Sequence, residues 1–77
     1  MMDKISVYAT TPCTVHSWLI HTPNKTFDSL RQAIEYASEH ADQLDALEVF
    51  VHGNNKSYDI ISGDELALLI ARVCSRA

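Results

Sequence analysis

The sequence has little of several features that define large classes of protein. Its 77 residues include two cysteines, two prolines, two glycines and one tryptophan. A pair of distant cysteines does not make the disulfide framework of a small secreted domain. Low proline and glycine contents exclude collagen-like and low-complexity chains. No apolar run approaches the roughly 18 residues that a membrane-spanning helix needs.

Basic residues are also scarce. Six Lys and Arg stand against ten Asp and Glu, so the formal net charge is −4 at pH 7. Nucleic-acid binding usually requires a basic surface, so we expect no nucleic-acid partner. The first residues lack the apolar stretch of a signal peptide, so we expect a cytoplasmic protein with reduced Cys13 and Cys74. A 13–74 bridge remains open, because it depends on geometry that the sequence does not give.

The first half of the chain is expected to form a hairpin and a helix. The composition is that of a soluble globular protein, and the length allows one small domain over residues 1–77. Alternation of apolar and polar residues predicts strands over residues 4–10 and 15–21, with a turn at Pro12. Apolar residues spaced three and four apart predict a helix over residues 27–44.

The second half repeats this order. Alternation predicts strands over residues 46–52 and 57–61, joined by the turn-forming residues 53–56. Ser62 and Glu65 match a capping box, which predicts a helix over residues 63–75. Its buried face would comprise Leu66, Leu69, Ile70, Val73 and Ala77.

These elements predict an α+β fold. The order β-β-α-β-β-α favours a four-stranded, mainly antiparallel sheet with both helices on one face, which is a two-layer sandwich. Such a sandwich leaves the other sheet face bare. Leu47, Val49 and Val51 would face the helices, with Ile5, Val7 and Ala9 beside them.

Aromatic side chains are the candidates for the bare sheet face. The opposite parity of the first and third strands gives Tyr8 and Phe50. The second and fourth strands would add Trp18 and Tyr58 in one of their two possible orientations, which also turns His16 and Ile60 outward. Exposed aromatics are typical anchors for a partner or a second subunit. The alternative is that Trp18 points inward and fills the small core. Leu68 lies off the buried stripe of its helix, either as a partner anchor or as an ordinary surface leucine.

Acidic residues gather between residues 28 and 48. Glu35, Glu39, Asp42, Asp45 and Glu48 would form a negative edge along the predicted first helix. Closely spaced negative charge steers a basic partner toward a protein. The alternative is a solvated helix face that keeps the domain soluble.

The sequence predicts no catalytic residue, no metal site and no cofactor. Cys13, His16 and His21 lie close in the sequence, but they lack a second ligand pair and have mixed strand parity. Cys13 and His16 are also the only local pair for nucleophilic catalysis, and no acid or oxyanion donor accompanies them. We therefore expect a protein that is not an enzyme.

The expected function is that of a non-catalytic, acidic protein-binding module with a larger, basic protein partner. Size, charge and element order are typical of small bacterial or phage accessory proteins and inhibitors, including anti-CRISPR proteins, which regulate nucleic-acid-handling complexes. The residues expected to bind are Glu35, Glu39 and Asp42 for steering and Tyr8, Trp18, Phe50 and Leu68 for anchoring. Two alternatives are a homodimer joined through the bare face or Leu68, and weak binding of single-stranded RNA by the sheet aromatics.

Overall fold

The computed structural model describes residues 4–19, 23–53 and 58–74. The backbone forms three helices, one 3-10 segment and four strands in those residues. In chain order they are α1 (Lys4–Val7), β1 (Cys13–Ser17), β2 (Lys25–Phe27), α2 (Leu30–Ser38), η1 (Ala41–Ala46), β3 (Leu47–His52), β4 (Tyr58–Ser62) and α3 (Gly63–Cys74).

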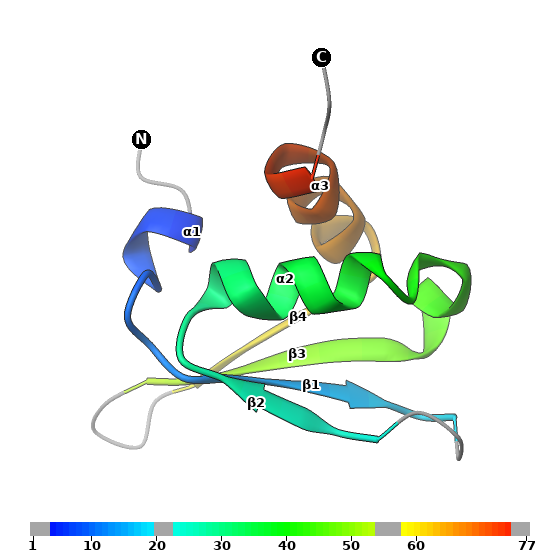
Figure 1. Ribbon diagram of the computed structural model, residues 1–77, viewed down its shortest axis with the longest axis horizontal. Helices are drawn as coiled ribbons and strands as arrows, with labels where there is room; N and C mark the ends of the chain where they lie inside the picture. The colour runs from blue at the N-terminus through cyan, green and yellow to red at the C-terminus, as the bar shows by residue number, and fades with distance from the viewer. Residues whose placement is uncertain (1–3, 20–22, 54–57, 75–77) are drawn as a thin grey trace.

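The strands form one antiparallel sheet with the order β2-β1-β3-β4. The central pair aligns Val15 with Val49, and Val49 aligns with Ile61 on the next strand. Figure 1 shows α2 and α3 on the same side of the sheet, and α2 packs against β1 while α3 packs against β4. The predicted α+β class and four-stranded antiparallel sheet are confirmed.

The core lies between the helices and one face of the sheet. Alternate strand residues point into it, and each helix contributes a stripe of apolar residues. The buried apolar residues are Cys13, Val15, Leu30, Ala33, Ile34, Ala37, Leu47, Val49, Val51, Ile61, Leu66 and Leu69.

The predicted strand over residues 4–10 is wrong. Lys4–Val7 forms the short helix α1, and a turn follows it. Ile5 and Tyr8 both pack against the core, and their three-residue spacing puts them on one side of a helical turn. An alternation of apolar and polar residues over so short a segment is compatible with a strand and with a helical turn. Val7 and Ala9, which the strand would have placed inside, are exposed.

The first hairpin uses different residues from those predicted. Its strands are β1 at Cys13–Ser17 and β2 at Lys25–Phe27, rather than residues 4–10 and 15–21. The strand β1 ends where the Ser17 hydroxyl accepts a hydrogen bond from the backbone N–H of Leu19 (3.0 Å). This local bond bends the chain at Trp18.

The predicted helix over residues 27–44 is divided. The helix α2 covers Leu30–Ser38, and η1 follows at Ala41–Ala46. Thr26, the polar residue just before the predicted helix, belongs to β2 and does not cap α2. Ser29 caps α2 instead: its backbone is extended, and its hydroxyl accepts from the backbone N–H of Gln32 (3.2 Å).

The second half of the chain is predicted closely. The strands β3 and β4 and the helix α3 each agree with the predicted ranges to within one residue at either end. Gly63 takes φ +58° directly after β4, a conformation that favours glycine and lets the strand turn straight into α3. The turn at residues 54–57 and Ala77 lie outside the described residues. None of the described helices has the length and apolar character needed to cross a bilayer.

Candidate functional site: the open sheet face

The sheet has one face that α2 and α3 do not cover (Figure 1). Along β1 and β3, residues alternate between buried and half-buried, and the buried ones face the helices. The residues between them therefore point to the opposite side. We call this surface the open face. It comprises the strand residues Thr14, His16, Thr26, Glu48, Phe50, His52 and Ile60, together with Trp18 and Asn24, which contact His16.

Apolar and aromatic side chains cross the open face as a diagonal row. Trp18 is 69% exposed, and Ile60 is 44% exposed. His16 lies between the rings of Trp18 (centroids 5.0 Å apart, edge to face) and Phe50 (5.9 Å). Phe50 lies opposite Ile60 on β4. We call Trp18, His16, Phe50 and Ile60 the aromatic row.

The aromatic row decides between the two interpretations of Trp18. A tryptophan that filled the core would be buried, whereas Trp18 keeps most of its surface in solvent. Leu30, Ile34 and Leu66 occupy the space between helices and sheet. The alternative in which Trp18 serves as a core residue is therefore wrong.

Hydrogen bonds hold the polar part of the open face. The Thr14 hydroxyl lies 2.8 Å from the Thr26 hydroxyl and 2.7 Å from Nε2 of His52, which links three strands. The side-chain oxygen of Asn24 accepts a hydrogen bond from Nδ1 of His16 (2.9 Å). That bond fixes the His16 ring plane between its aromatic neighbours.

Glu48 lies on the open face beside the aromatic row. The β1–β3 register places it directly opposite His16, and it precedes Phe50 by two residues on β3. Directly opposite residues on one face have Cβ atoms roughly 5 Å apart. The sequence grouped Glu48 with the acids of the first helix, but the structure puts it on the other side of the sheet from α2.

Tyr8 does not belong to the open face. It follows α1 on the helix side, packs against the core and donates a hydrogen bond to Asp59 (3.2 Å). Desolvation, followed by that hydrogen bond, raises the pKa of Tyr8. The prediction that Tyr8 anchors a partner through the bare sheet face is wrong, because it rested on a strand that does not form.

A lysine joins the ends of the chain on this helix side. Lys4 Nζ lies 2.9 Å from Asp59 and 2.8 Å from Glu65. Its hydrogen bonds to Glu65 and Asp59 raise the pKa of Lys4, and the bond from Lys4 is the main cause that lowers the pKa of Asp59. Lys4, Asp59 and Glu65 thus connect α1 to β4 and α3, and their charges are paired with one another.

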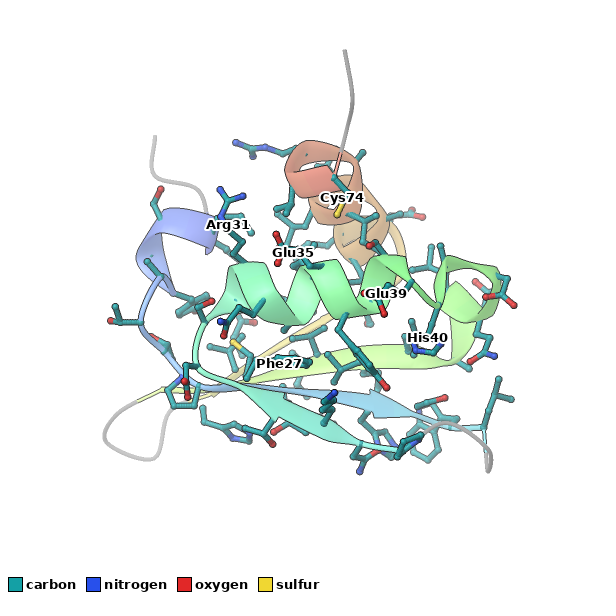
Figure 2. All side chains as sticks on the ribbon, viewed as in Figure 1. Phe27, Arg31, Glu35, Glu39, His40 and Cys74 are labelled. Carbon is teal, nitrogen blue, oxygen red and sulfur yellow. The ribbon has the colours of Figure 1, made fainter. Side chains whose placement is uncertain are left out.

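The acidic steering residues lie on the helix layer. Glu35 and Glu39 project from α2 (Figure 2), and Asp42 belongs to η1; all three are exposed. Leu68 is 59% exposed on α3. The structure thus separates these three acids from the aromatic row, with the sheet between them, so one flat partner surface cannot contact both.

Tyr58 stands opposite His52 in the β3–β4 register. Its side chain lies outside the described residues, so its predicted place in the aromatic surface stays a prediction. Asp45 is exposed in η1, with Asp42.

The described residues offer little for catalysis or metal binding. Cys13 is buried and faces the helices, whereas His16 faces the open side, so the two do not pair. Burial raises the pKa of Cys13 to about 11. Cys13 and Cys74 are both free thiols. Among the described residues, no three His, Cys, Asp or Glu side chains are grouped so that they could hold a metal ion.

Comparison with known proteins gives no relative: no family model, no curated protein and no solved structure matches the chain. The interpretation of the open face therefore rests on its own geometry. The sequence left open whether His16 and Ile60 face outward, gave neither a binding role, and grouped Glu48 with the acids of the predicted first helix. Strand parity was the available signal, since all three share a face with Phe50 once the register is known.

Proposed function

We propose that this chain is a non-catalytic protein-binding module whose open face docks onto a larger protein. One observation carries the proposal: the aromatic row is exposed on a sheet face that the protein's own helices leave uncovered. Trp18 alone keeps 69% of its surface in solvent. Tryptophan and other large aromatics dominate the binding energy of protein interfaces.

The supporting framework around the row favours binding over internal packing. His16 is held by Asn24 and flanked by two rings, so its side chain is ordered before a partner arrives. An ordered surface loses less conformational entropy on binding than a mobile one. The open face is thus a preorganised patch with an apolar centre and a polar border of Thr14, Thr26 and His52.

The charge of the chain favours a basic partner. The net charge is −4, and Glu35, Glu39 and Asp42 are exposed on the helix layer. These acids do not touch a partner seated on the open face, so their part is long-range steering. Proteins that handle nucleic acid expose basic surfaces, and an acidic module that occupies such a surface acts as an inhibitor or regulator.

The aromatic row also resembles what a single-stranded RNA binder needs, but the surrounding charge opposes it. Stacking platforms for bases work inside positively charged grooves. No Lys or Arg of the described residues lies on the open face, and Glu48 stands in its middle. A protein partner satisfies both the aromatic row and the negative charge.

Affinity capture with matched variants tests the proposal. The wild-type protein and Trp18→Ala are immobilised and exposed to extract of the cells that produce the protein, and bound proteins are quantified by mass spectrometry. Val7→Ala is the control, because Val7 is 48% exposed on α1, on the other side of the sheet. A partner held by the wild type and Val7→Ala, and lost by Trp18→Ala, supports the open face.

Three further results would contradict the proposal, one of them from an added Leu68→Ala variant. A partner retained equally by all three proteins would place binding elsewhere, and loss on Leu68→Ala alone would place it on α3. Recovery of the chain itself as the only specific partner, with dimers in sedimentation, would favour the structural homodimer.

A further inference from the structure

The open face carries a carboxylate whose surroundings match one kind of ligand. From the arrangement of Glu48 within the aromatic row, we infer that the open face binds an arginine side chain of its protein partner. The inference rests on the proposed function and specifies the chemistry that the open face recognises.

Strand register surrounds Glu48 with aromatic and apolar groups. His16 lies directly opposite on β1, Phe50 follows two residues later on β3, and Ser62 lies opposite on β4. Trp18 and Ile60 occupy the neighbouring diagonal positions, which long and aromatic side chains can reach. Glu48 is thus a half-buried residue beside the aromatic row.

Glu48 has no cationic partner within the described part of the chain. Among those residues, no hydrogen bond or ion pair involves the Glu48 carboxylate, whereas Lys4 pairs with Asp59 and Glu65. Asp59, by contrast, forms an ion pair with Lys4 and accepts a hydrogen bond from Tyr8.

The described basic side chains all lie away from the open face. Lys4 belongs to α1, Arg31 to α2 and Arg72 to α3. Lys25 stands opposite Val15, a residue that faces the helices, and its Nζ lies over the rings of Phe27 and Tyr36 (5.8 and 5.4 Å). The open face is therefore a negatively charged, aromatic surface without a described Lys or Arg of its own.

Arginine fits this surface better than other side chains. Its guanidinium is planar, so it can stack on the indole of Trp18 while it donates hydrogen bonds to the Glu48 carboxylate. Its methylene groups can pack on Phe50 and Ile60. Lysine offers a compact, strongly hydrated charge that stacks less well, and a phosphate group would be repelled by Glu48.

Nuclear magnetic resonance titration with defined peptides tests the inference. The probes are three blocked glycine peptides that carry one arginine, one lysine or one citrulline, which keeps the shape of arginine without its charge. We expect the arginine peptide to shift the amide signals of His16, Glu48 and Phe50 and the indole signal of Trp18. The citrulline peptide is expected to shift them far less.

Variants separate a local site from general attraction by an acidic protein. Glu48→Gln should weaken binding of the arginine peptide by about two- to fivefold, the upper part of the range for an exposed ion pair. Glu39→Gln removes the same charge from the helix layer and should change affinity by less than about 1.5-fold at physiological salt, because screening weakens distant charges. Trp18→Ala should cost about two- to fivefold through the lost stacking.

Each remaining outcome decides against the inference in a distinct way. Equal shifts from the arginine and citrulline peptides would show that the open face binds peptides without recognising the charge of arginine. The inference would then be wrong, and the proposed function would be unaffected. Tighter binding of lysine than arginine would contradict the planar stacking. Open-face signals that move with the protein's own concentration would make a second copy the occupant. If no peptide shifts the open face, the inference is wrong, and the capture experiment alone judges the proposed function.

Discussion

Replacing Trp18 with alanine should leave the fold largely intact. About a third of the Trp18 surface is covered, since 69% is exposed. Truncating a fully buried aromatic residue to alanine costs about 3–5 kcal/mol, so a third of that burial predicts a loss of about 1–1.5 kcal/mol. Leu66 is fully buried between α3 and the sheet, and Leu66→Ala should cost about 2–5 kcal/mol.

Urea unfolding followed by circular dichroism measures both variants, because Trp18→Ala removes the only tryptophan and with it the fluorescence signal. A 77-residue domain has a total stability of only about 4–12 kcal/mol, so the two losses are well separated on this scale. Trp18→Ala should remain folded with a moderately lowered urea midpoint, whereas Leu66→Ala should unfold at a much lower urea concentration. Equal destabilisation by the two substitutions would show that Trp18 is a core residue and would refute the open face.

Three further predictions concern residues on the side of the sheet that faces the helices and the turn into α3. The hydrogen bond from Lys4 lowers the pKa of Asp59 in the folded protein below its ordinary value of 3.8, so ionised Asp59 stabilises the fold at pH values above 3.8. Unfolding experiments between about pH 5 and about pH 3 should therefore show a loss of stability as Asp59 becomes protonated. Asp59→Asn should lose less over that range, by under about 1 kcal/mol, because the pair is partly exposed; an unchanged pH dependence would contradict the pairing. Cys13, with its pKa raised to about 11 by burial, should resist a thiol reagent that modifies the half-buried Cys74, and should react at the unfolding rate; comparable rates in the folded protein would show that Cys13 is accessible. Gly63→Ala should destabilise by about 1 kcal/mol through its positive φ alone, since no atom lies within 4 Å of the added Cβ, and a neutral effect in thermal melts would show that the turn relaxes freely.

The sequence predicts the second half of the fold well because its signals are local and agree. Leu47, Val49 and Val51 alternate with polar residues, and Leu66 and Leu69 recur at helical spacing. Each pattern is long enough to exclude the other period. The strands and the helix there differ from their predicted limits by no more than one residue.

The first half was predicted less well because tertiary contacts override local preference there. Residues 4–10 alternate like a strand, but Lys4 is held by Asp59 and Glu65 from the far end of the chain. The strand β2 has only three residues, Lys25–Phe27, and is recognised by its pairing with β1 rather than by its sequence. Neither the Lys4 ion pairs nor the β1–β2 pairing can be predicted from a few consecutive residues of the sequence.

The residues of the candidate site were predicted from the sequence only in part. Phe50 lies on the face that its strand parity predicted, and Trp18, whose orientation the sequence left open, lies on the same side against His16. Tyr8 was assigned to that face through a strand that does not form, and Glu48 was grouped with the acids of α2. Only the register, which joins residues far apart in the chain, brings Glu48 beside the aromatic row.

The proposed function gives the acids on the two sides of the molecule different physical roles. Glu35 and Glu39, exposed on the helix layer, would act on a partner at a distance, while Glu48, on the open face, would act by contact. Removing a steering charge changes mainly the association rate and its salt dependence, and removing a contacting charge changes mainly the dissociation rate. Kinetic measurements on Glu35→Gln and Glu48→Gln with one partner would therefore distinguish the two groups.

The environment of Trp18 in the complex tests the central claim most directly. The protein is produced with fluorotryptophan in place of its single tryptophan, and the fluorine resonance is followed while the captured partner is added. We expect a solvent-exposed resonance in the free protein that shifts and loses its sensitivity to solvent as the partner saturates the open face. A Trp18 resonance that keeps its solvent sensitivity in the saturated complex would contradict docking through the open face.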